Sequence, residues 1–135
     1  MRPEPRRVVE DFITAINRQD LDALTSLMAD DHVFVDAEGS VHEGRDVMAA
    51  GWRDYFDMFP DYQISPEHIL ADGGLVAVFG STTGTYRAGG GTPEANRVGG
   101  PAAWRAVVED GKIKTWQVYA DYTHVWEVIG ARENA

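Results

Sequence analysis

The sequence predicts an α+β protein in which three N-terminal helices pack on one face of a curved antiparallel sheet. Two observations carry this prediction. Before Pro60, apolar residues recur at helical spacing in three segments. After Pro60, the chain consists of long apolar and β-branched runs joined by short turns. Helices that precede a meander of strands are typical of the α+β class.

The first helix is predicted over residues 8–16, where apolar residues follow a spacing of four. Asp20 stands where an N-cap is needed for a short second helix over residues 21–28. The third helix is predicted over residues 45–59, because its apolar residues form one stripe and Pro60 stops the helix.

The strands are recognised by β-branched and aromatic residues between turn residues. They are expected over residues 32–36, 62–71, 75–86, 101–109 and 112–122. Asp72-Gly73-Gly74 and Asp110-Gly111 are typical hairpin turns. Residues 87–100 are rich in Gly and are expected to form a flexible loop, and residues 123–129 are expected to extend the last strand.

Length and composition limit the number of domains, the partners and the kinds of chemistry that this chain can have. A chain of 135 residues is predicted to form a single domain, residues 1–135. It has 12 basic and 22 acidic residues, a net charge of −10, which disfavours nucleic acid and anionic membranes as partners. The absence of Cys excludes disulfides, thiolate catalysis and cysteine-bound metals. No secretory leader or membrane span is visible, so a cytoplasmic protein is expected.

Both faces of the predicted sheet are partly apolar, because alternation in the strands over 75–86 and 112–122 is imperfect. A sheet with this pattern covers a core with one face and meets another subunit with the other. A homodimer is therefore expected through the outer face of the sheet. Its expected contact residues are Arg105, Val107, Gln117 and Tyr119.

Five motifs occur in a characteristic order. They are the segment from Val8 to Asp36, Phe59-Pro60-Asp61, Gly84-Thr85, Asp110-Gly111-Lys112-Ile113, and the ending Trp116, Tyr119, Asp121. Together they resemble the nuclear transport factor two-like superfamily, in its SnoaL-like and ketosteroid isomerase-like branch, over roughly residues 8–122. The resemblance implies a cone in which a curved sheet wraps around the helices and opens at one end to an apolar pocket.

Asp36 falls where ketosteroid isomerases keep their general base, so the resemblance implies a catalytic role for it. A carboxylate inside an apolar pocket is desolvated, which raises its pKa and makes it a better proton acceptor. The alternative is that Asp36 caps the end of the strand and faces water beside Glu38.

The other catalytic groups of these relatives are missing. Phe12 stands where ketosteroid isomerases have a Tyr donor, and no carboxylate lies between Arg97 and Glu109 to supply the second donor. Val118 replaces an Asp of limonene epoxide hydrolase-like enzymes, and Gln117 replaces a carboxylate of SnoaL-type cyclases. The resemblance implies that Trp116, Val118 and Ala120 face the pocket, so Asp121 is expected at a strand end, turned away from it.

The cone implied by the resemblance would place a set of aromatic and hydroxyl side chains around its pocket. These expected substrate-binding residues are Phe12, Phe34, Trp52, Tyr55, Phe56, Phe79, Ser81, Thr83, Trp104, Trp116 and Val118. The aromatic residues favour a flat apolar ligand, and the hydroxyls of Tyr55, Ser81 and Thr83 would orient a carbonyl or hydroxyl group. Without a pocket, the same aromatic residues would simply form the core.

Two functions follow for this chain. The first is a cofactor-free isomerase, cyclase, dehydratase or hydrolase that acts on a small apolar polyketide- or terpenoid-like molecule with Asp36 as acid or base. The second is a non-catalytic module that binds a small molecule or dimerises. No metal is expected, because His32, His42, His68 and His124 lack the spacing of metal ligands.

Overall fold

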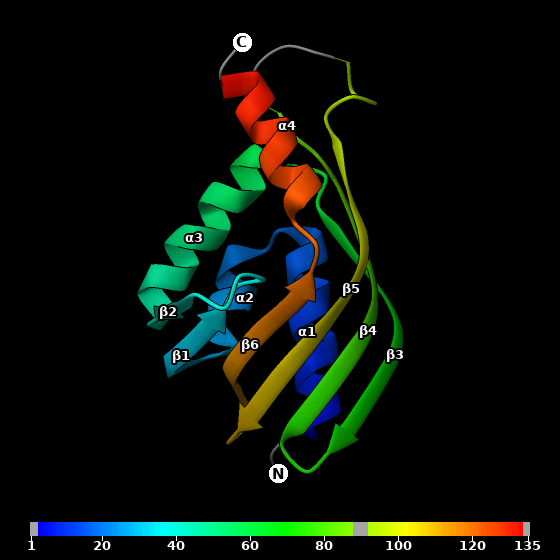
Figure 1. Cartoon of the computed structure of the whole chain (residues 1–135). Helices are drawn as coiled ribbons and strands as arrows, with labels where there is room; N and C mark the ends of the chain where they lie inside the picture. The colour runs from blue at the N-terminus through cyan, green and yellow to red at the C-terminus, as the bar shows by residue number, and fades with distance from the viewer. Residues whose placement is uncertain (1–2, 88–91, 134–135) are drawn as a thin grey trace.

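The computed structural model describes residues 3–87 and 92–133, and the helices and strands below belong to that part of the chain. The helices are α1 (Pro5–Arg18), α2 (Leu21–Ser26), α3 (Arg45–Met58) and α4 (Thr123–Glu133). The strands are β1 (Met28–Val35), β2 (Val41–Glu43), β3 (Gln63–Asp72), β4 (Leu75–Thr85), β5 (Arg97–Glu109) and β6 (Lys112–Ala120). Figure 1 shows the long strands β3, β4 and β5 curving around α1, which gives the α+β cone that the sequence predicts.

The six strands form one sheet in the order β2-β1-β6-β5-β4-β3. Neighbouring strands are antiparallel in every pair except one. β1 runs parallel to β6, with Phe34 opposite Trp116. The sheet is therefore mixed rather than wholly antiparallel, because the first strand inserts beside the last one.

The junction of α1 and α2 forms as the sequence predicts. α1 buries an apolar stripe against the concave face of the sheet and contacts β3, β4, β5 and β6. Gln19 ends α1 in the left-handed region, with φ of 55°. The Asp20 side chain then accepts a hydrogen bond from the Ala23 N–H at 3.1 Å, which confirms the predicted N-cap.

Several strand boundaries differ from the prediction. β1 begins at Met28 rather than in the thirties, because Met28 is buried and already pairs with Ile113 of β6. β2 was not expected, since its three residues are exposed and carry no apolar pattern. β5 begins at Arg97, inside the segment predicted to be a loop, and residues 88–91 of that segment lie outside the described residues.

The expectation that residues 123–129 extend the last strand is wrong, because they form the first part of α4. The Asp121 carboxylate accepts a hydrogen bond from the Thr123 N–H at 2.9 Å, and the Trp126 N–H closes the first turn on the Tyr122 carbonyl at 3.0 Å. Val125 and Val128 are three residues apart and both buried, so the segment buries a helical face. Figure 1 shows α4 at the end of the molecule opposite the N-terminus.

The inside of the cone is filled by aromatic side chains between α1 and the central strands. Trp104 of β5 and Trp116 of β6 stack with ring centroids 6.2 Å apart, and Phe12 of α1 packs on Trp116 at 4.9 Å. All three side chains are almost fully buried. Among the described residues, no helix is long and apolar enough to cross a membrane.

Candidate functional site

Asp36 follows the last residue of β1 and organises the turn that leads to β2. Its Oδ1 atom accepts hydrogen bonds from the backbone N–H groups of Glu38 and Ser40, both at 3.0 Å. Its own backbone N–H donates to the Ser40 carbonyl at 3.0 Å. The side chain is 30% exposed, so Asp36 lies at the rim of the cone rather than inside it.

The second oxygen of Asp36 bonds a residue that the sequence analysis did not select. His42 of β2 lies 2.9 Å from Asp36 Oδ2 through its Nε2 atom. The antiparallel register of β1 and β2 sets Phe34 opposite His42, and their ring centroids are 5.7 Å apart. Because β2 is so short, periodicity gave no signal that would have placed His42 beside Asp36.

The pKa of Asp36 differs from the expectation. Partial burial raises it, but the hydrogen bonds from His42, Ser40 and Glu38 together lower it, and the pKa lies below the usual range of Asp. Asp36 is therefore ionised at neutral pH. A carboxylate with a lowered pKa is a weak base.

An apolar pocket adjoins this pair between β1, β2 and α3. Its volume is about 220 Å³, and we call it the side pocket. Its walls are Phe34, His42, Val47, Met48, Gly51, Trp52 and Tyr55. The pocket unites three of the predicted binding residues, Phe34, Trp52 and Tyr55. The Trp52 Nε1 atom is buried and has no hydrogen-bond partner among the described residues.

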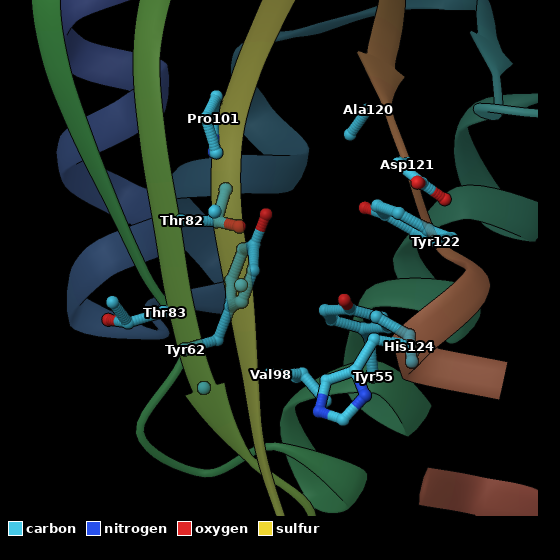
Figure 2. A pocket seen from close by; sticks show the side chains of 14 residues that line it. Tyr55, Tyr62, Thr82, Thr83, Val98, Pro101, Ala120, Asp121, Tyr122 and His124 are labelled. Atoms are coloured by element: carbon cyan, nitrogen blue, oxygen red, sulfur yellow. The ribbon is translucent and has the colours of Figure 1, made fainter. Parts of the chain in front are cut away.

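A second cavity of about 230 Å³ lies under α4, and we call it the tyrosine pocket. Figure 2 shows the hydroxyl groups of Tyr55, Tyr62 and Tyr122 pointing into the same space between β4, β5 and the segment that follows β6. Burial raises the pKa of all three phenols above the ordinary value, so they are neutral hydrogen-bond donors at physiological pH. The sequence analysis selected Tyr55 but missed Tyr62 and Tyr122.

Several predicted binding residues lie elsewhere. Phe12, Phe56, Trp104, Trp116 and Val118 are buried in the core. They line neither the side pocket nor the tyrosine pocket. These positions face inward, as expected, but neighbouring side chains fill the space that a ligand would need.

The sequence analysis selected the wrong face of β4 as the one that faces the inside of the cone. Phe79 is 46% exposed on the outer face of the sheet, because Val76 and Val78 are the residues that face the core. Ser81 follows the outward alternation. Thr83 lines the tyrosine pocket, but Figure 2 shows its hydroxyl directed away from the cavity, while the largely buried Thr82 lies beside it. Thr82 is thus the β4 hydroxyl at the tyrosine pocket.

The Asp36 turn is also tied to α4. The Trp126 Nε1–H group donates a hydrogen bond to Glu38 Oε1 at 2.8 Å, across the rim of the cone. Asp121 was expected to lie away from the pocket, but it lines the rim of the tyrosine pocket. It is exposed there, and its carboxylate accepts the hydrogen bond that begins α4. Within the described part of the chain, no group of three or more acidic or His side chains is arranged to hold a metal ion.

Comparison with known proteins identifies the family. The model of the SnoaL-like domain matches residues 9–116, so the chain belongs to the SnoaL-like domain family. None of the curated proteins matches the chain.

Solved structures support the same fold. A proposed polyketide cyclase from Xanthomonas campestris pv. campestris superposes with a TM-score of 0.80 at 23% identity, over 93% of this chain and 96% of that one. An LEH-like epoxide hydrolase from M. tuberculosis has a TM-score of 0.76 at 22% identity, over 97% and 92%. An NTF2-like protein from Burkholderia thailandensis has a TM-score of 0.79 at 19% identity, over 94% and 98%. At these identities the likeness establishes the cone fold.

Proposed function

We propose that this protein is a cofactor-free acid/base enzyme of the isomerase, cyclase, dehydratase or hydrolase type. Its substrate would be a small apolar polyketide- or terpenoid-like molecule bound in the side pocket. The observation that carries the proposal is the bond between Asp36 and His42 at the wall of that pocket. Titratable groups paired at an apolar pocket are the usual arrangement for acid/base catalysis.

The roles of the two residues follow from their bond. Because Asp36 is ionised, it accepts the proton of His42 Nε2–H, which leaves Nδ1 as the ring nitrogen that takes a proton from the substrate. When Nδ1 gains that proton, the Asp36 carboxylate stabilises the resulting imidazolium. Phe34 and Trp52 would hold the apolar part of the substrate.

A small carbon-acid probe tests the proposal without knowledge of the natural substrate. The protein is incubated in D₂O with a panel of cyclic ketones and enones, and exchange of the protons next to the carbonyl group is followed by NMR. His42→Gln is expected to slow exchange by about 10²–10⁴-fold, the usual scale for loss of a general base. His68→Gln is the matched control, because His68 is exposed on β3.

The Asp36→Asn variant tests the catalytic role of Asp36 separately from its role in the turn. Its side-chain oxygen still accepts the Glu38 and Ser40 N–H groups, but the amide nitrogen replaces the carboxylate oxygen that bonds His42. We expect exchange to fall strongly while the melting temperature stays within a few degrees. Exchange that is equally fast in the His42→Gln and wild-type proteins would reject the acid/base role.

The alternative is a module that binds a small molecule without catalysis. It is favoured by the two backbone hydrogen bonds of Asp36, which by themselves account for an Asp at this turn. In that case Asp36→Ala would lose roughly 0.5–2 kcal/mol of stability, as removal of a cap does. The wild-type protein would bind the ketones in the side pocket, as chemical-shift changes would show, and would not exchange their protons.

A further inference from the structure

The tyrosine pocket is lined by three phenol groups, which have no role in the chemistry proposed for Asp36 and His42. Its three phenols come from separate parts of the chain: Tyr55 from α3, Tyr62 from the connection to β3, and Tyr122 from the connection to α4. The rings of Tyr55 and Tyr62 meet edge to face at 5.1 Å. The fold therefore brings three hydroxyl groups to one small cavity, as Figure 2 shows.

The hydrogen-bonding capacity of these hydroxyls is only partly used. The Tyr55 and Tyr122 side chains lie close enough for each to affect the pKa of the other. No hydrogen-bond partner of the Tyr62 hydroxyl lies among the described residues, although Tyr62 is 6% exposed. Its hydroxyl points into the cavity and is accessible there, so it can donate to water or to a group that enters the cavity.

The lining defines which group would fit. Neither Lys nor Arg lines the cavity, whereas apolar side chains such as Val98 and Val125 do, and Asp121 contributes a carboxylate at its rim. Such a lining disfavours an anion, because among the described residues no Lys or Arg compensates its charge, and the His124 ring at the cavity already contacts the Glu127 carboxylate and the Arg97 carbonyl. Neutral phenols donate well to an uncharged oxygen with free lone pairs.

We propose that the tyrosine pocket binds the carbonyl oxygen of a small neutral organic molecule, with the Tyr62 and Tyr122 hydroxyls as donors. The inference rests on the proposed function in one respect, namely that a small organic molecule enters the cone. A cavity of about 230 Å³ limits the bound part to a single ring or a short chain. Tyr55 lines both pockets, so the tyrosine pocket lies next to the side pocket.

The test compares cyclohexanone with methylenecyclohexane, which has the same shape but carries a CH₂ group in place of the carbonyl oxygen. Binding of both is measured by NMR titration of wild type, Tyr62→Phe and Tyr122→Phe. Each variant keeps its ring and loses one hydroxyl. We expect each variant to bind cyclohexanone about three- to tenfold more weakly, as for loss of one hydrogen bond. Affinity for methylenecyclohexane is expected to stay unchanged.

Tyr86→Phe is the matched control, because Tyr86 is a buried tyrosine that packs on Phe59 and does not line the cavity. It should leave both affinities unchanged. If cyclohexanone binds the Tyr62→Phe and Tyr122→Phe proteins as well as the wild type, the hydroxyls are not its donors and the proposal is wrong. Chemical-shift changes confined to the side pocket would also reject it.

Tetramethylammonium distinguishes the hydroxyl groups from the ring faces. This cation has no hydrogen-bonding group and binds aromatic faces. If it binds more tightly than cyclohexanone and keeps its affinity in both Phe variants, the site recognises cations and the carbonyl assignment is overturned. Because these measurements concern binding alone, they can fail while the exchange reaction of His42 persists, and the reverse is also true.

Discussion

At the scale of single residues, His32 is a titratable side chain that is buried in the core. Its side chain is fully buried between α1 and β6, and its Nδ1 atom lies 2.8 Å from the Ile113 carbonyl oxygen. Nδ1 must therefore carry the proton, which leaves Nε2 as a lone-pair acceptor with no partner in the described part of the chain. The ring is neutral in the folded protein, because protonation would place a positive charge inside the apolar core.

This arrangement makes stability depend on pH. Burial lowers the pKa of His32, although the bond to the Ile113 carbonyl opposes the shift. In the unfolded chain a His titrates near about 6.5, so below that pH the unfolded state binds a proton that the folded state refuses. We expect the free energy of unfolding to fall as pH drops from about 7 toward 5. Urea denaturation across this range measures the slope.

His32→Leu checks the origin of the slope, because it fills the site with an apolar side chain that does not titrate. The variant should lose most of the dependence between about pH 7 and 5, whereas His68→Gln should retain it. The carboxylates whose pKa lies below normal, Asp31, Asp36 and Asp121, lose their stabilising contribution only at lower pH, as they become protonated. An unchanged slope in His32→Leu would assign the effect to other groups.

At the scale of elements, β4 and β5 approach each other closely at Gly99, on the edge of the tyrosine pocket. Gly99 has φ of 134°, and a Cβ atom there would lie 2.1 Å from the Thr82 carbonyl oxygen. Gly99→Ala is expected to lower the free energy of unfolding by more than about 1 kcal/mol, because both strain and a clash with backbone must be relieved. Chemical denaturation measures the change.

Gly130 of α4 is the matched control for that substitution. It is helical, and a Cβ atom there would meet nothing within 4 Å. Gly130→Ala should raise stability by up to about 1 kcal/mol through helix propensity. Equal effects of the two substitutions would show that Gly99 is not held by the contact with Thr82.

Helices and strands in which apolar residues recur at a regular spacing could be predicted from the sequence. Those without such a spacing could not. The stripe in α1 and the Asp20 cap define their helices locally. β2 has only three exposed residues, so nothing marked it, and His42 was missed with it. In α4, the β-branched residues of 123–129 favoured a strand by composition, while the helical spacing of Val125 and Val128 decides the structure.

The candidate site was predicted only in part. Phe34, Trp52 and Tyr55 were selected and do meet in the side pocket. The face of β4 could not be assigned, because apolar residues occur on both faces and only the register with β5 decides which one is buried. The pairing of Asp36 with His42 depends on a turn and a register that no periodicity reveals.

At the scale of the whole molecule, none of the described residues covers the outer face of the sheet around Phe79 and Tyr119. The register aligns Phe79 with Ala103 and Tyr119 across β4, β5 and β6. Phe79 and Tyr119 are 46% and 50% exposed. The contact residues predicted for a homodimer, Arg105, Val107 and Gln117, lie on these strands as well.

We expect a dimer at micromolar concentration, measured by light scattering after size exclusion. Tyr119→Glu should produce a monomer, because a charge in an apolar interface is costly to bury. Val41→Glu is the control, as Val41 is 57% exposed on β2, an edge strand outside the group of β4, β5 and β6. The net charge of −10 on each copy predicts that added salt strengthens the dimer. A wild-type monomer would contradict this.

The parallel pairing of β1 with β6 also has a consequence for how the protein forms. β1 follows the first two helices, yet its neighbour in the sheet is the last strand. During synthesis, β1 and β5 each keep an open edge until residues 112–120 have left the ribosome and insert between them. Nascent chains aggregate through such unpaired strand edges. Closure of the sheet must therefore wait for the last strand, so native structure is gained late and refolding is expected to be slow for a chain of this length.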